Sequence, residues 1–142
     1  MTIQRLSSVT LGVQDVERSR NFYAAVGFSR RFEDKATVAF ESEGMLLVLR
    51  PWDVLADEFG VAPQGAGFRG FHLTCLFDSE EAVDAAYEGW IGAGGVGVRQ
   101  PSSRPWGGHA AVVADPDAHL WELCTATQFP AERPTAGSTQ EA

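Results

Sequence analysis

The order of strand-like and helix-like segments occurs twice along the 142-residue chain. The first half contains a strand, a helix and three more strands, over 7–13, 16–28, 29–34, 36–42 and 45–51. The second half repeats this order over 70–77, 78–95, 96–103, 106–114 and 118–125. A repeated βαβββ order predicts an α+β protein of two modules, whose curved mixed sheets form a cup with the helices outside.

Turn residues mark the limits of the modules. The stretch "VAPQGAGFRG" is rich in Gly and Pro, so we expect an N-terminal module over 1–60, a connector over 61–69 and a C-terminal module over 70–126. The remaining residues, 127–142, are rich in Pro, Ser, Thr and Gly and predict a flexible tail. Asp15 is the expected N-cap of the first helix, and the spacing of Asp78 and Glu81 predicts a capping box for the second.

Alternation along the strands separates a large apolar face from a smaller, more polar one. In the first strand Val9, Leu11 and Val13 lie on one face, opposite Ser8 and Thr10. The apolar face is expected to lie under the helix, so the polar face should line a concave surface.

The second module shows the same division. His72 and Thr74 alternate with large apolar residues, and Glu122 stands between Trp121 and Leu123. Burying a carboxylate among apolar side chains without a hydrogen-bonding partner costs free energy, on the order of several kcal/mol or more. Glu122 is therefore predicted to face a partly polar cavity.

Charge and composition exclude several classes of partner. Acidic residues outnumber basic ones, 19 to 11, for a formal net charge of −8, whereas duplex binding needs clustered cations, so we expect no nucleic acid partner. No apolar run approaches the roughly 20 residues of a membrane span, and the start lacks the apolar segment of a secretory signal, so we expect no membrane partner. Cys75 and Cys124 are expected to be reduced thiols in the cytoplasm.

Two stretches carry a family resemblance: "VTLGVQDVERSRNFYAAVGF" near the front and "ADPDAHLWEL" near the back, with the double βαβββ order between them. Over roughly residues 5–126 the chain resembles the vicinal oxygen chelate superfamily. That superfamily includes glyoxalase I, extradiol dioxygenases, fosfomycin-resistance enzymes and bleomycin-binding proteins, so the resemblance is specific for the fold and leaves the reaction open. The chain departs from the family at Ala118, where glycine is usual.

The resemblance implies four metal-ligand positions, one on the first and one on the last strand of each module. They fall on Ser8, a residue near Leu47, His72 and Glu122. Only His72 and Glu122 can bind a divalent transition metal, and protein sites normally supply three or four ligands. We therefore expect no metal and no cofactor; any metal that is bound would be held by these two residues. His109 adds no ligand, because its strand parity directs it away from the cavity.

Side chains on the cavity faces and at their rim are the candidate ligand contacts. Trp106 begins a strand on which small residues leave room above the sheet, and Trp52 follows the last strand of the first module. Phe40 is a candidate by strand parity, with a core position as the alternative. Aromatic rings bind flat conjugated ligands by offset stacking. The complete set is Ser8, Thr10, Phe40, Leu47, Trp52, His72, Thr74, Trp106, Gly108, Ala110, Val112 and Glu122.

These features favour a metal-free binding protein that encloses a hydrophobic aromatic small molecule. The resemblance to drug-binding relatives implies antibiotic sequestration in self-resistance, with a bleomycin-, mitomycin- or enediyne-like ligand. The alternative is a metal-dependent glyoxalase-like isomerase or dioxygenase that uses His72 and Glu122. A metal-free enzyme with either residue as general base also stays open. Because family members usually pair, we expect a homodimer.

Overall fold

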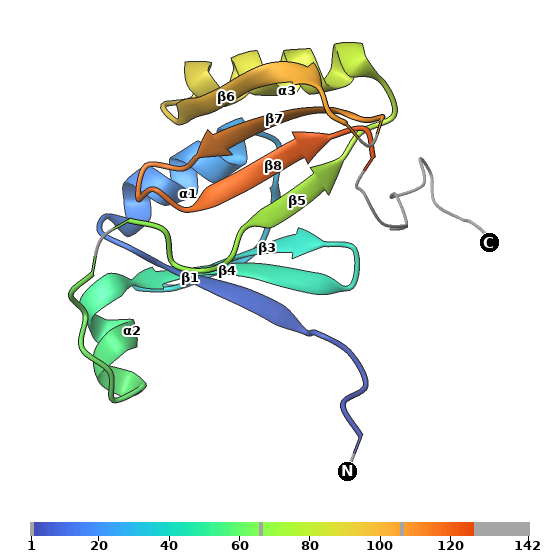
Figure 1. The fold of residues 1–142 in the computed structure, drawn as a ribbon. Coiled ribbons are helices and arrows are strands. Elements are labelled where there is room, and N and C mark those ends of the chain that lie inside the picture. Colours follow the sequence, from blue (N-terminus) through green and yellow to red (C-terminus); the bar gives the residue numbers. More distant parts are fainter. Residues whose placement is uncertain (1, 66, 106, 127–142) are drawn as a thin grey trace. The chain divides into compact units, whose positions relative to one another are not determined.

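A computed structural model describes residues 2–65, 67–105 and 107–126 (Figure 1). The chain divides after Arg69 into two compact units, and each contains a four-stranded mixed sheet with its own helices. The predicted α+β fold, with a βαβββ order in each half, is therefore confirmed. None of the helices in these described ranges has the length and apolar character needed to cross a lipid bilayer.

The sheet of the first unit has the strand order β1-β4-β3-β2. β1 and β4 are parallel, whereas β4 with β3 and β3 with β2 are antiparallel. A second short helix, α2, follows β4 directly. The elements are β1 (Ser8–Val13), α1 (Val16–Ala25), β2 (Ser29–Glu33), β3 (Val38–Ser42), β4 (Met45–Pro51) and α2 (Trp52–Glu58).

The second unit repeats this topology without the short helix. Its strand order is β5-β8-β7-β6, with β5 and β8 parallel and the other two pairs antiparallel. The elements are β5 (Leu73–Leu76), α3 (Glu80–Gly92), β6 (Val96–Ser103), β7 (His109–Ala114) and β8 (Leu120–Cys124). In both units the first and last strands of the βαβββ order therefore lie side by side.

Each long helix begins at a side-chain cap. The Asp15 carboxylate accepts a hydrogen bond from the Arg18 backbone N–H at 3.0 Å, as predicted for α1. At α3 the expected capping box is wrong by one residue, because Ser79 rather than Asp78 is the N-cap. The extended backbone of Ser79 lets its hydroxyl accept the Ala82 N–H at 3.1 Å.

Aromatic side chains form the core between α1 and the first sheet. Phe40 of β3 is fully buried, with its ring centroid 6.2 Å from that of Tyr23 on α1 and 6.2 Å from that of Phe28. The apolar face of β1 and β4 completes this layer with Leu11, Val13, Leu47 and Leu49. The large apolar face is therefore covered by α1, as the alternation predicts.

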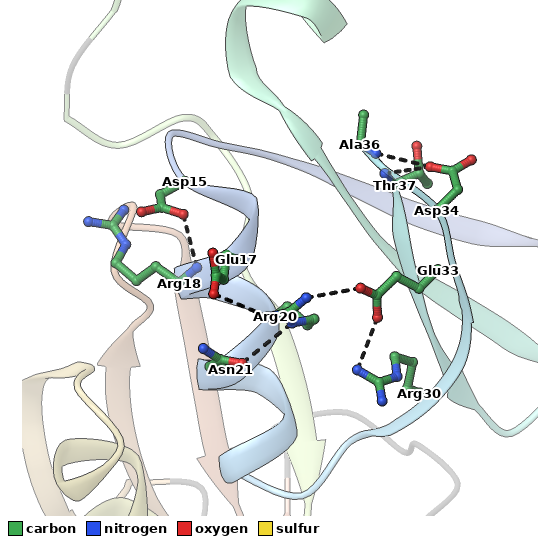
Figure 2. A network of polar contacts seen from close by, with 10 residues as sticks. All are labelled: Asp15, Glu17, Arg18, Arg20, Asn21, Arg30, Glu33, Asp34, Ala36 and Thr37. Atoms are coloured by element: carbon green, nitrogen blue, oxygen red, sulfur yellow. Dashed lines mark hydrogen bonds and ion pairs between the residues drawn. The ribbon is translucent and has the colours of Figure 1, made fainter.

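An ion-pair network on the surface joins α1 to β2 (Figure 2). The Arg20 guanidinium lies 2.9 Å from Glu33 Oε2 and 3.6 Å from Glu17 of its own helix, while Arg30 reaches the other Glu33 oxygen at 3.0 Å. These side chains are partly exposed, and exposed pairs typically contribute about 0–1 kcal/mol each. The network therefore contributes less to the packing of α1 on the sheet than burial of the aromatic core does.

The core of the second unit is built around two tryptophans. Trp90 of α3 lies 5.6 Å from Trp121 of β8, centroid to centroid, and its indole N–H donates to the Ala114 carbonyl oxygen at 2.7 Å. Gly95 allows this close approach, since a Cβ there would overlap the Trp90 indole and lie 2.9 Å from the Ala114 oxygen. Helix α3 is therefore held on its sheet by packing and by a hydrogen bond from the indole.

The hairpin between β7 and β8 is closed by a buried carboxylate. Asp115 accepts the backbone N–H groups of Asp117 at 2.9 Å and His119 at 2.8 Å. Ala118 has a φ of 70°, the left-handed region in which glycine is usual in the family. An alanine there costs about 1 kcal/mol relative to glycine, a strain that the turn's hydrogen bonds can offset.

Candidate functional site

The face of the second sheet that points away from α3 carries several polar side chains, including Arg99 and Ser102 of β6, which pair with Val112 and Ala110. Thr74 of β5 pairs with Glu122 of β8, and Glu122 pairs with Val112 of β7, so these residues share one face. Trp121, the neighbour of Glu122, points to the opposite face and packs against α3. Glu122 therefore lies on the open side of the sheet, on the parity that the sequence predicts.

His72, Thr74 and Glu122 form a hydrogen-bonded set that we call the polar row. The Thr74 hydroxyl donates to Glu122 Oε1 at 3.3 Å, and His72 Nδ1 lies 3.3 Å from Thr74 Oγ1. His72 Nδ1 also lies 3.4 Å from the Leu73 carbonyl oxygen. His72 and Thr74 are exposed and Glu122 is half-buried, so the row is accessible from the open face of its unit.

Small and apolar residues lie beside the polar row. Val112 is half-buried, whereas Ala110 and its cross-strand partner Cys124 are fully buried on the same face. Gly108 lies just before β7 and is also buried. Trp106, the aromatic candidate that the sequence placed before this strand, lies outside the described residues. The row thus borders an apolar surface, an arrangement typical of sites that orient organic ligands.

Phe40 and Leu47 do not lie on the cavity face for which they were predicted, and Phe40 takes the core position that was its alternative. Ser8 pairs with Leu46, whereas Leu47 pairs with Phe40 on the opposite, helix-covered face. Leu47 is 4% exposed and Phe40 is fully buried. A shift of one residue in strand register moves a side chain to the other face of a sheet, which is why both residues join the core under α1.

The first sheet repeats the geometry of the polar row with different side chains. Thr10 pairs with Val48 in the same parallel register that joins the threonine and glutamate of the row. Ser8 stands two residues before Thr10, in the place that histidine takes in the second unit. Val48, the residue next to Leu47, is therefore the counterpart of the glutamate. Neither Ser8 nor Val48 supplies a strong metal ligand.

Trp52, the first residue of α2, lies on the same face as Ser8 and Thr10. A Cβ added to Gly12 would lie 3.4 Å from the Trp52 Cα and 3.5 Å from its ring, so the indole covers this glycine. The indole N–H donates to the Pro63 carbonyl oxygen at 2.8 Å, and the Arg69 guanidinium lies 4.8 Å from the ring centroid. Trp52 is half-buried and held in place from several sides.

Two charged residues on the open face of the first sheet were not identified as site candidates from the sequence. Arg50, paired with Gly12, makes a bidentate contact with Glu58 of α2 at 2.8 Å for each oxygen, and this hydrogen bonding lowers the pKa of Glu58. Glu41 pairs with Leu46 and contacts an arginine of β2. Strand register, once known, would have placed both on the open face.

A family-wide sequence profile, described as Glyoxalase/Bleomycin resistance protein/Dioxygenase superfamily, matches residues 5–123. The chain belongs to this superfamily. The predicted resemblance to the superfamily is therefore confirmed. Among curated proteins, none matches the sequence significantly.

Solved structures share the fold of this superfamily member. A glyoxalase-related enzyme from Fulvimarina pelagi is 29% identical, with a TM-score of 0.78 over 86% of this chain and 88% of that one. A hypothetical protein from S. aureus is 22% identical, with a TM-score of 0.79 over 89% and 96%. Lactoylglutathione lyase from Agrobacterium tumefaciens is 16% identical, with a TM-score of 0.66 over 87% and 94%. The last two likenesses concern the fold alone.

The donors that this superfamily member offers to a metal are few. Within residues 2–65, 67–105 and 107–126, no three His, Cys, Asp or Glu side chains are arranged to hold a metal ion. His109 contacts Asp84 of α3 at 2.8 Å and Glu80 at 4.0 Å, so it lies on the helix side, away from Glu122. His72 and Glu122 thus remain the two candidate ligands on the open face.

The thiols of the second unit are poor nucleophiles. Burial, together with a smaller effect of the nearby Cys124, raises the pKa of Cys75 to about 11. With this pKa, Cys75 is almost entirely protonated at neutral pH. Little of the thiolate, which is the reactive form, is therefore present. Cys124 is fully buried, and neither residue forms a disulfide. Covalent chemistry through either cysteine is therefore disfavoured.

Proposed function

We propose that this member of the superfamily binds a hydrophobic aromatic small molecule directly, without a resident metal ion, and serves in antibiotic sequestration. The main support is the strand register of the first unit, which puts Ser8 and Val48 where the second unit has His72 and Glu122. Stable transition-metal sites normally use three or four protein ligands. This chain has two such donors on the second sheet and none at the equivalent positions of the first sheet. It is therefore better suited to bind an organic ligand than a metal ion.

Affinity in such a site would come from apolar contact, and orientation from the polar row. Val112 and the small residues of β7 offer an apolar surface next to Thr74 and Glu122. Sites for small molecules commonly combine a mainly apolar lining with a few polar groups. The bleomycin resistance proteins named in the superfamily description suggest an antibiotic as the ligand.

The test measures thermal unfolding and calorimetric binding with bleomycin, mitomycin C and an anthraquinone-fused enediyne as probes. A bound probe raises the unfolding temperature by mass action. Glu122→Ala should weaken binding by about tenfold or more, because it removes a charged hydrogen-bonding group. Glu88→Ala removes the same charge from the exposed side of α3 and should leave Kd unchanged. Failure of all three probes to bind, or equal Kd in Glu122→Ala, would contradict the proposal.

A metal-dependent isomerase or dioxygenase is the second candidate, since His72 and Glu122 share the open face of one sheet. In that case a metal would act as a Lewis acid on substrate oxygens. Metal analysis of protein purified without chelator separates the two functions. Near-stoichiometric Fe, Mn, Ni or Zn that is lost in Glu122→Ala would favour the enzyme and overturn the proposed metal-free binding.

We also propose that the protein works as a homodimer in the cytoplasm. The family resemblance supports pairing, as do large apolar side chains that are exposed in the two units: Phe32, Phe59, Phe68 and Phe71. The two free thiols fit a reducing compartment. Sedimentation velocity should give the mass of two chains; a single species with the mass of one chain across micromolar concentrations would exclude the dimer.

A further inference from the structure

We infer that the polar row selects a ligand that carries a protonated amine. This inference rests on the proposed binding function and concerns its ligand class. The argument comes from the direction of each hydrogen bond in the row, which determines the groups that are left for a ligand.

The first step concerns His72 Nδ1. This atom lies 3.4 Å from the Leu73 carbonyl oxygen and 3.3 Å from Thr74 Oγ1. A carbonyl oxygen can only accept a hydrogen bond, so contact with it requires a hydrogen on Nδ1. In a neutral imidazole only one ring nitrogen carries hydrogen. The other nitrogen, Nε2, is therefore left with a lone pair.

The second step concerns the threonine. Thr74 has a single hydroxyl hydrogen, and it is donated to Glu122 Oε1 at 3.3 Å. The hydroxyl oxygen is then free to accept from His72 Nδ1–H at 3.3 Å. The hydrogen bonds run in one direction, from imidazole to hydroxyl to carboxylate, and the donors of the row are used internally.

The groups left over are acceptors. They are His72 Nε2 and the second carboxylate oxygen of Glu122, and among the described residues no other side chain donates to the carboxylate. Arg99 of β6 lies on the same face, paired with Val112, but the described residues place no arginine or lysine in a salt bridge with Glu122. A carboxylate without a paired cation, next to a basic imidazole nitrogen, favours a ligand that brings both hydrogen and positive charge.

A protonated amine meets both requirements, because it has several N–H donors and a full positive charge. Carboxylate, phosphate and sulfate ligands bring further acceptors and would be repelled by Glu122. The formal net charge of −8 works in the same direction, since it raises the local concentration of cations. We therefore assign to the row the ammonium group of an aromatic amine whose ring rests on the apolar surface beside Val112.

The premise can be measured without a ligand. Two-bond ¹H–¹⁵N correlation spectra at alkaline pH, where imidazoles are neutral, identify the tautomer of His72. The expected state carries hydrogen on Nδ1. Thr74→Val keeps the side-chain shape and suits a strand, but it removes the hydroxyl, so the fraction with Nδ1–H should fall. Thr74→Ser should restore that fraction. A His72 that carries its hydrogen on Nε2 in the unmodified protein would overturn the inference.

The ligand class is tested with three probes that share one aromatic core: naphthalen-2-ylmethylammonium, naphthalen-2-ylmethanol and 2-naphthoate. The ammonium probe should bind about tenfold or more tightly than the alcohol, and the carboxylate most weakly. Kd values come from chemical-shift titrations that include the signals of residues 72–76 and 120–124. Glu122→Gln keeps the side-chain size and should abolish the preference, whereas Glu88→Gln, with the same change in charge, should retain it.

The outcomes separate this inference from the proposed function. Equal affinity for the ammonium and the alcohol, or a preference that survives Glu122→Gln, would overturn the ammonium assignment and leave aromatic binding intact. If none of the naphthalene probes shifts the signals of β5 and β8, and none of the antibiotic probes binds, the inference and the proposed function both fail.

Discussion

Replacing Phe40 with alanine is expected to lower the free energy of unfolding by about 3–5 kcal/mol, the usual range for a fully buried phenylalanine. The phenyl ring is 0% exposed and lies 6.2 Å, between centroids, from each of the rings of Tyr23 and Phe28. Its removal leaves a cavity between α1 and β3 that these rings cannot fill without leaving their own positions. Urea unfolding of the two proteins measures the difference.

Phe32→Ala is the matched control for this prediction. Phe32 lies on β2 of the same sheet and is 53% exposed, so its loss should cost no more than about 1 kcal/mol. Phe40→Leu should fall between the two and provides a milder variant if Phe40→Ala does not fold. If Phe40→Ala lowers the free energy of unfolding as little as Phe32→Ala does and also weakens ligand binding, Phe40 lies on the binding face and not in the core.

Replacing Trp90 with alanine, in the second unit, is expected to lower the free energy of unfolding by about 3–5 kcal/mol. Trp90 is 4% exposed, packs on Trp121 and donates its indole N–H to the Ala114 carbonyl oxygen at 2.7 Å. The substitution removes the packing of α3 on β8 and leaves the Ala114 carbonyl oxygen without that donor. The free energy of unfolding, measured in urea, reports the sum of the two losses.

Two variants separate packing from hydrogen bonding at this position. Trp90→Phe keeps an aromatic ring but removes the N–H, so its cost should lie near 1–3 kcal/mol, about the value for an unsatisfied buried acceptor. Ile91→Ala changes the next residue of α3, which is 40% exposed, and should cost much less than Trp90→Ala. If Trp90→Ala and Ile91→Ala destabilise equally, Trp90 is not a central part of this core.

Much of the fold follows from local sequence patterns. Alternating residues in the strands predict which face of β1 lies under α1, and they put Glu122 and Trp121 on opposite faces of β8. Asp15 and the glycine-rich segment after residue 92 mark helix ends because the backbone groups there need particular partners or dihedral angles. Patterns of this kind act over a few residues, so the chain displays them without its tertiary structure.

Pairing between distant strands is the part that local patterns leave open. The sequence "MLLVLRP" is apolar at almost every position, so its alternation does not show which residues lie opposite Ser8 and Thr10. For the same reason Leu47 and Phe40 were predicted on the wrong face, and Arg50 and Glu41 were missed.

The sequence by itself determined the double βαβββ order, the Asp15 cap of α1, the superfamily resemblance and the choice of His72 and Glu122 as the polar residues of interest. Only the tertiary structure decided that Thr74 links these two residues, that Val48 is the counterpart of Glu122, and that Phe40 belongs to the core. The physical reason is that hydrogen bonds and packing contacts between strands far apart in the sequence depend on register. A slip of one residue reverses the face of every side chain in a strand.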